Sequence, residues 1–177
     1  NTCGWRSRIG YVQQEVYLLD ASFKENIAFG EEPENIDENK LKQVIEQASL
    51  KLLVESLPEH WDTNVGERGA KISGGQKQRI GIARALYKGA DVLVFDEATS
   101  ALDGITEDTI LEAIHNLAHK KTIVIIAHRL STIMKADKIV VMDEGRVVQM
   151  GKHKDLIKKR GVYRELWKIQ KGGFIEE

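Results

Sequence analysis

The sequence has little of several residue types, and each shortage excludes a class of protein. Cys3 is the single cysteine among 177 residues, so an internal disulfide cannot form and a reducing compartment fits. Only 2 prolines and no low-complexity run are present, which leaves no obvious linker. No apolar run approaches the roughly 20 residues that a membrane-spanning helix needs, and no signal peptide is visible. A disulfide-rich scaffold and a membrane-spanning chain are therefore not expected.

An excess of charge of one sign is also missing. The chain has 26 Lys and Arg against 27 Asp and Glu, for a net charge of -1. General binding to nucleic acid depends on an excess of Lys and Arg, so we expect no nucleic-acid partner. Hydrophobic residues make up 42% and charged residues 30%, which is typical of a globular chain of about one domain.

The most informative stretch lies between residues 71 and 103. Ser73-Gly74-Gly75-Gln76 is a small-residue turn that opens a helix, and a helix start with flexible glycines offers unpaired N–H groups to an anion such as phosphate. Residues 92–95 form a continuous apolar run, the pattern of a strand buried on both faces. This strand delivers Asp96 and Glu97 at its carboxyl end, where open α/β sheets bind ligands. Taken singly, the turn could be an ordinary helix start and the two acids could cap the next helix.

Together, in this order and spacing, these residues resemble the signature motif, Walker B strand and D-loop of ATP-binding cassette (ABC) ATPases, with Ile72 where the family usually has Leu. The resemblance implies an α/β fold, with a P-loop NTPase-like parallel sheet flanked by helices and an α-helical signature subdomain. It also implies ATP and Mg²⁺ as ligands. The expected parts are a Q-loop and helical signature subdomain over about 15–80, a catalytic core over 81–150 and a carboxyl-terminal helical tail over 151–177.

The resemblance assigns roles to single residues. Asp96 would hold Mg²⁺, usually through water, and Glu97 would polarise the attacking water. Neighbouring strand residues point opposite ways, so the two acids are not expected to share one task. Gln14 takes the place of the Q-loop glutamine, which ligates Mg²⁺ or orients the water, and His128 takes that of the switch histidine, which contacts the γ-phosphate. Read without the family, Gln14 would be a solvated loop residue and His128 a structural one.

Other matching motifs imply partners. In the family the signature of one subunit completes the ATP site of a second one in a head-to-tail dimer, so residues 73–76 are expected to bind nucleotide in trans. Ser100 and Asp103 match the D-loop, which crosses to that subunit, although Asp103 could also be a helix N-cap. Glu67 and Arg68 lie between glycines and resemble the X-loop of exporters; the plain alternative is a charged turn. These motifs imply a transmembrane domain as partner, at the cytoplasmic face of the cell membrane.

Local patterns predict the remaining elements. Ser22 with Glu25 forms a capping box that starts a short helix. The apolar face of the next helix is expected to reach Leu52, and a second short segment is expected from Leu52 to Leu57. In the loop before the capping box, Tyr17 and Leu18 are each either core residues or part of a surface that receives the transmembrane domain. Three basic residues after the signature are expected on a solvated helix face: Lys77, Arg79 and Arg84. Strands are predicted over residues 8–12 and, fully buried, 122–127, and a hairpin over 138–142 and 146–150.

A phosphate-binding loop is missing from these residues. A Walker A motif needs Gly-x-x-x-x-Gly-Lys followed by Ser or Thr, and the only Gly-Lys pair, Gly151-Lys152, is followed by His153. We therefore expect the carboxyl-terminal part of an ABC nucleotide-binding domain, with the amino-terminal strands and P-loop missing. Such a chain should bind ATP weakly and hydrolyse none measurably, because that loop supplies most contacts to the β-phosphate. It should also be poorly stable, since the missing strand is central in the family's sheet.

The function that the resemblance implies is ATP binding and hydrolysis that powers an exporter of an amphipathic, lipid-linked or drug-like substrate. The alternatives are a soluble ABC ATPase that acts on DNA or ribosomes, and a non-catalytic fragment that offers its signature to a complete domain. The X-loop match and the run from His128 to Ser131 favour the exporter.

Overall fold

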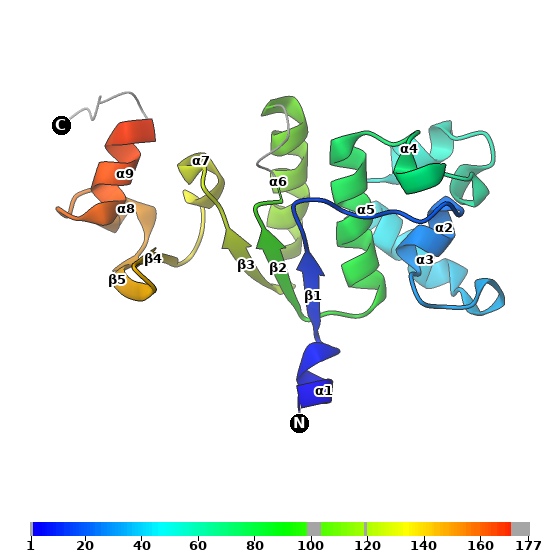
Figure 1. Ribbon diagram of the computed structural model, residues 1–177, viewed down its shortest axis with the longest axis horizontal. Coiled ribbons are helices and arrows are strands. Elements are labelled where there is room, and N and C mark those ends of the chain that lie inside the picture. Colours follow the sequence, from blue (N-terminus) through cyan, green and yellow to red (C-terminus); the bar gives the residue numbers. More distant parts are fainter. Residues whose placement is uncertain (1, 99–103, 119, 171–177) are drawn as a thin grey trace. The chain divides into compact units, whose positions relative to one another are not determined.

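The computed structural model describes residues 2–98, 104–118 and 120–170 (Figure 1). The chain forms two compact units, residues 1–126 and 127–177. Within the described ranges, no helix is long and apolar enough to cross a membrane.

A three-stranded parallel sheet organises the first unit. Its strands are β1 (Ile9–Val12), β2 (Val92–Asp96) and β3 (Thr122–Ile126), in the order β1-β2-β3. The middle strand ends at Asp96, as the sequence predicts. Val12 pairs with Phe95, and Asp96 pairs with Ile126, so the three carboxyl ends meet at one edge of the sheet.

One face of this sheet is covered by two long helices, α5 (Gly74–Tyr87) and α6 (Gly104–Ala118) (Figure 1). The helix α5 passes so close to β1 that a Cβ atom on Gly10 would lie 2.6 Å from the Cβ of Ala85, so only glycine fits there. The central strand places Leu93 and Phe95 on this covered face, and both are fully buried.

The opposite face of the sheet is left open in the described part of the unit. Tyr11 projects from it, and Val124 and Ile126 on β3 are 44% and 49% exposed. The prediction that β3 is buried is therefore wrong, and so is the prediction that β2 is buried on both faces, since Val92 and Val94 are only half-buried. The apolar run of β3 is that of a strand with both faces covered, but only the Ile123 and Ile125 side packs against the core. Among the described strands, β2 is the only neighbour of β3.

A group of short helices lies between β1 and α5. The first, α2 (Phe23–Ile27), begins with the predicted capping box, because Ser22 and Glu25 each bond the other's backbone N–H. The others are η1 (Pro33–Asn35), α3 (Glu38–Gln47), α4 (Lys51–Ser56), η2 (His60–Asp62) and η3 (Glu67–Gly69), and a short α1 (Thr2–Arg6) precedes β1.

The predicted apolar face is right for α3 but wrong for Leu52. Leu41, Val44 and Ile45 are buried. The backbone then turns at Ser49, whose φ of 55° is left-handed, and a separate helix begins. The change of helix axis breaks the periodicity, and Leu52 on α4 is 81% exposed.

Three basic side chains of α5 are half-buried, which corrects the prediction of a solvated face. Each donates to a main-chain carbonyl in the segment between β1 and α5, and buried donors and acceptors of this kind are normally paired. Burial lowers the pKa of both arginines. The bonds, all 2.9 Å long, are Lys77 Nζ to Arg68 O, Arg79 Nη1 to Ser49 O and Arg84 Nε to Asn26 O.

The second unit contains the predicted hairpin, with β4 (Ile139–Asp143) antiparallel to β5 (Arg146–Gly151). Glu144 and Gly145 form its turn with φ angles of 44° and 75°, the left-handed pair of a type I′ turn. The short helices α7 (Leu130–Ile133) and α8 (His153–Leu156) and the helix α9 (Val162–Gln170) complete the unit. Its core is a small cluster: Leu130, Ile139, Val141, Leu156 and Tyr163.

Candidate active site at the carboxyl end of β2

Asp96 and Glu97 occupy a sharp turn at the end of the central strand. Asp96 is the last residue of β2, and the backbone N–H of Glu97 still donates to Ile126 O at 2.9 Å. Glu97 has a φ of 51°, a left-handed conformation that costs a non-glycine residue about 1–2 kcal/mol. The alternation of the strand therefore ends at Asp96. Both residues line one cavity, and their having different tasks stays a prediction.

The phenol of Tyr11 contacts the Asp96 side chain. Tyr11 on β1 pairs with Val94 on β2, so Tyr11 and Asp96 share the open face as diagonal neighbours. The Tyr11 hydroxyl donates a hydrogen bond to the Asp96 carboxylate. That bond, together with burial and the nearby negative charge, raises the pKa of Tyr11. Sequence reasoning missed Tyr11, because the contact depends on the register of strands 85 residues apart.

An open cavity of about 410 Å³ lies at this edge of the sheet. It brings together Gln14, Asp96 and Glu97, which the sequence predicts as site residues, and the predicted roles of the three stay predictions. The other lining residues are Tyr11, Gln13 and Glu15. Carboxylate and amide oxygens suit Mg²⁺, which is bound through few side chains with phosphates and waters completing its shell. The described residues contain no group of three or more His, Cys, Asp or Glu that could hold a metal by itself.

The backbone of the Gln14 loop is held by α5. Gln78 is only 4% exposed, and its Nε2 donates to Gln13 O at 3.1 Å and also to Gln14 O. The Oε1 atom of Gln78 is buried and has no hydrogen-bond partner within the described part of the chain. Sequence reasoning missed Gln78, since a glutamine inside a helix gives no sign of what it contacts.

The signature forms the predicted start of α5. Ser73 is the N-cap, with Gln76 N donating to Ser73 Oγ at 3.3 Å and Ser73 N donating to Gln76 Oε1 at 2.9 Å. Gly74 is exposed, whereas Gly75 is buried, and a Cβ on Gly75 would lie 2.0 Å from a methyl of Thr106 on α6. Gly75 is therefore needed for the close packing of α5 against α6, apart from any contact that it makes with a ligand. The signature is not among the residues that line the cavity.

The other predicted site residues lie elsewhere or outside the description. Glu67 and Arg68 are exposed in the single turn η3, where Arg68 has a φ of 50°. Ser100 and Asp103, the predicted D-loop residues, lie outside the described residues. His128 belongs to the second unit, where its main-chain oxygen accepts a 2.5 Å bond from Gln170 Nε2. Its role toward a nucleotide stays a prediction.

A parallel α/β sheet with acids at its carboxyl end and a capped helix beside it has the architecture of a P-loop NTPase-like ATP-binding domain. The family model described as ABC transporter matches residues 1–100. The chain therefore belongs to the ABC transporter family, and the predicted family and fold class are confirmed.

Similar proteins are ATP-binding proteins of the same family. The heterocyst differentiation ATP-binding protein HepA of Nostoc sp. is 44% identical over 163 residues, which cover 92% of this chain and 26% of HepA. The ATP-dependent lipid A-core flippase of Cupriavidus metallidurans is 46% identical over 166 residues, or 93% of this chain and 28% of the flippase. A solved structure of a bacterial Atm1-family ABC exporter with ATP bound superposes with a TM-score of 0.84 at 40% identity, covering 97% of this chain and 30% of that one. The chain thus spans between a quarter and a third of these relatives.

Proposed function

We propose that this chain is part of the ATP-hydrolysing domain of an ABC exporter. The observation that carries the proposal is the cavity in which Gln14, Asp96 and Glu97 meet at the carboxyl end of a parallel sheet. The similarity to a flippase and an Atm1-family exporter supports the transport role.

Each site residue then has a task in phosphoryl transfer to water. Asp96 would hold Mg²⁺, with Gln14 as a further oxygen ligand, and bound Mg²⁺-ATP would supply the reacting phosphoryl group and neutralise its charge. Glu97 would orient the attacking water and draw its proton, which typically contributes about 10²–10⁴-fold. His128 would donate a hydrogen bond to the γ-phosphate.

The partner of this site is a second nucleotide-binding domain. Residues 73–76 of one domain would bind the nucleotide of the other, because an exposed helix start offers N–H groups and a positive dipole end to phosphate. The D-loop residues Ser100 and Asp103 would cross between the two domains.

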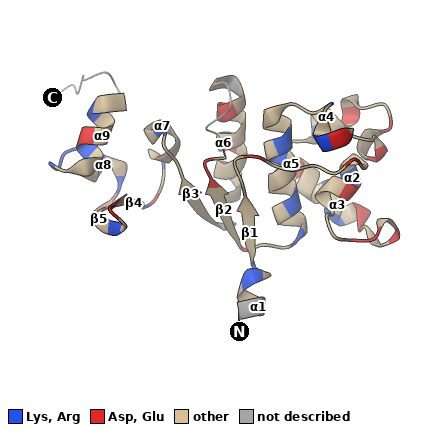
Figure 2. Ribbon diagram, viewed as in Figure 1, with Lys and Arg blue, Asp and Glu red and all other residues tan. Residues whose placement is uncertain are grey.

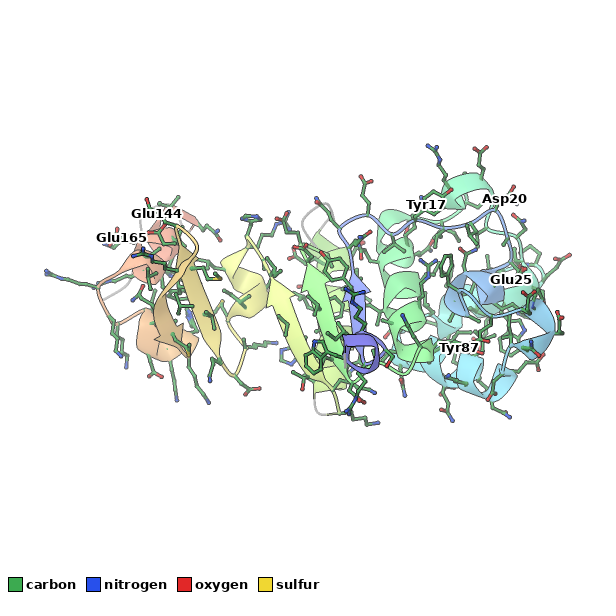
Figure 3. The ribbon with its side chains drawn as sticks, turned by 60° about the horizontal axis from the view of Figure 1, so that its bottom comes forward. Tyr17, Asp20, Glu25, Tyr87, Glu144 and Glu165 are labelled. Atoms are coloured by element: carbon green, nitrogen blue, oxygen red, sulfur yellow. The ribbon has the colours of Figure 1, made fainter. Side chains whose placement is uncertain are left out.

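A separate surface on the first unit suits a transmembrane partner at the cytoplasmic face of the cell membrane. Tyr17 is 63% exposed and Phe29 is also exposed, while Leu18 is fully buried. Figure 3 shows Tyr17 and Asp20 along the loop that leads from β1 to α2. Arg84 secures this loop from beneath: its guanidinium donates to Tyr17 O at 3.2 Å and stacks 4.8 Å from the Phe29 ring. The side chains are thus presented on a fixed backbone.

The charge of this region indicates the chemistry of the partner segment. Residues 15–70 contain 13 Asp and Glu against 5 Lys and Arg, and acidic side chains are frequent on α2–α4 and their loops (Figure 2). We therefore expect an amphipathic segment that carries Lys or Arg beside its apolar side chains. The transported substrate would be amphipathic, lipid-linked or drug-like, a range that includes the lipid named in the flippase relative.

By itself, the chain is proposed to bind ATP weakly and to hydrolyse none measurably. These 177 residues contain no Walker A motif, so Asp96 and Glu97 have no phosphate loop to hold the triphosphate against them. The same observation favours a second candidate function, a non-catalytic fragment that presents residues 73–76 to a complete domain.

Two measurements test these proposals. First, Mg²⁺-dependent phosphate release is measured for the chain and for Glu97→Gln. A turnover that disappears in Glu97→Gln would refute the inactivity of the isolated chain. Second, the chain is mixed with a complete ABC domain, and vanadate-trapped nucleotide is counted. Trapping should rise with the chain and not with Ser73→Arg; no rise with the unsubstituted chain would contradict signature binding in trans.

A further inference from the structure

The amide of Gln78 has only one favourable orientation. Both carbonyls that it faces, Gln13 O and Gln14 O, are acceptors, and Nε2 supplies the two hydrogens that they need. A flipped amide would place Oε1 against two carbonyl oxygens. The observed orientation leaves Oε1 buried without a partner in the described part of the chain, a cost that most buried polar atoms avoid. The contact with the Gln14 loop is retained in spite of that cost.

Gln78 also lies on the helix that begins with the signature. It is five residues beyond Ser73, about 7.5 Å along the axis at 1.5 Å per residue. An α-helix moves as a rigid element over so short a distance. The Gln14 loop and residues 73–76 are therefore joined through about 1.4 turns of the same helix.

We propose that Gln78 is a positioning residue: it fixes the Gln14 loop so that Gln14 faces Asp96 and Glu97, and it joins this loop to the signature. The role given to Gln14 rests on the proposed function, whereas the anchoring of the loop does not. In a head-to-tail dimer the Gln14 loop serves one ATP site and the signature of the same chain serves the other. Gln78 would then link the two sites within each polypeptide.

The test is amide hydrogen exchange of the full chain without nucleotide. In Gln78→Met, a side chain of similar length that lacks both donors, the amides of residues 13–17 should exchange about tenfold faster. Those of α6 should stay unchanged. Gln78→Asn keeps the amide but is one methylene too short, and should show the same local increase. Gln43→Met makes the same chemical change on the exposed side of α3 and should alter neither region.

Unchanged exchange at residues 13–17 in Gln78→Met and Gln78→Asn would overturn the proposal. An equal increase in α6 would also overturn it, because Gln78 would then stabilise the whole unit and not the loop. A second readout is thiol labelling of Gln14→Cys in a Cys3→Ser background, which should become several-fold faster when Gln78→Met is added. Neither readout requires ATP hydrolysis, so a failure of the proposed function is distinguished from a failure of this inference.

Discussion

At the amino end of the β1–β2–β3 sheet opposite charges are paired, whereas at the carboxyl end carboxylates gather around one cavity. Arg8 Nη2 lies 2.6 Å from Asp91 Oδ2, and Lys121 Nζ lies 3.7 Å from Asp91 Oδ1. The bond from Arg8, and then the charge of Lys121, lower the pKa of Asp91. One carboxylate thus joins the residues that precede all three strands.

At the carboxyl end the surroundings of the acids differ. Glu15, Asp96 and Glu97 line the same cavity, and the bond that Asp96 accepts comes from the neutral phenol of Tyr11. Here the neighbouring acid raises the pKa of the tyrosine.

The two ends also differ in backbone strain. The turn before β2 uses Gly89 at a φ of 82°, which glycine adopts without strain, whereas the turn after β2 places Glu97 at 51°. The amino end pairs its charges around an unstrained turn, while the carboxyl end keeps a strained residue, a feature that clusters at functional sites. Asp91, just before β2, is paired with basic side chains, whereas Asp96 and Glu97 at the other end of β2 are the acids proposed for the active site.

The largest expected difference between substitutions at the two ends is in the rate of ATP hydrolysis. In a longer protein that joins this chain to a phosphate-binding loop and its strand, Glu97→Gln should lower ATP hydrolysis at least about 100-fold. Asp91→Asn should leave it within about twofold, since Asp91 lies at the far end of β2. Phosphate release under saturating Mg²⁺-ATP measures both. Equal losses in the two variants would break the comparison.

The stability of β2 is expected to depend on the side chains of its covered face. Phe95 is 1% exposed, and replacing it by Ala should lower the free energy of unfolding by about 3–5 kcal/mol. Val94→Ala, one residue away on the open face, should cost about 1 kcal/mol. Urea unfolding followed by circular dichroism gives both values. Similar costs would show that the open face is packed as tightly as the covered one.

The two turns should respond oppositely to exchange of their left-handed residues. Gly89→Ala should destabilise the chain by about 1 kcal/mol, although a Cβ there meets no atom within 4 Å, because alanine is strained at that φ. Glu97→Gly should stabilise the chain by about 0.5–1 kcal/mol by relieving the same strain. Melting temperatures of the two variants provide the measurement. A destabilising Glu97→Gly would mean that Glu97 is not strained.

The smallest expected effect is the contribution of Asp91, at the amino end of the sheet, to the pH dependence of stability. The pKa of Asp91 is depressed in the folded state from its ordinary value of 3.8. The stabilisation by Asp91 is therefore present above that value and is lost as the pH falls through the lower folded pKa. Asp91→Asn should reduce the melting temperature slightly at pH 6 and make it less dependent on pH below about 5. Asp20→Asn, in an exposed loop, is the control and should leave the pH dependence unchanged.

Local signals predicted much of this arrangement from sequence alone. The apolar run before Asp96, the capping box at Ser22, the helix start at Ser73 and the Gly145 turn each depend on residues a few positions apart, and all four appear in the structure. Gln14 was placed at the site by its resemblance to the Q-loop and not by any local pattern.

Features that depend on distant contacts could not be predicted. The burial of β3 depends on what covers its second face, which its own composition does not show. Arg84 finds its acceptor at Asn26, 58 residues earlier, so a basic residue that would otherwise be solvated is half-buried. Leu52 keeps the helical spacing of α3, but the turn at Ser49 places it on a different axis.

The outer edge of β3 can accept another strand. Among the described strands none pairs with that edge, and an unpaired edge beside an apolar face is a template for β-augmentation. Fragment complementation is the consequence: a separately produced segment that supplies a parallel strand should dock there and become ordered. In its absence, copies of the chain compete for the same edge, and the fraction of soluble protein should fall as concentration rises.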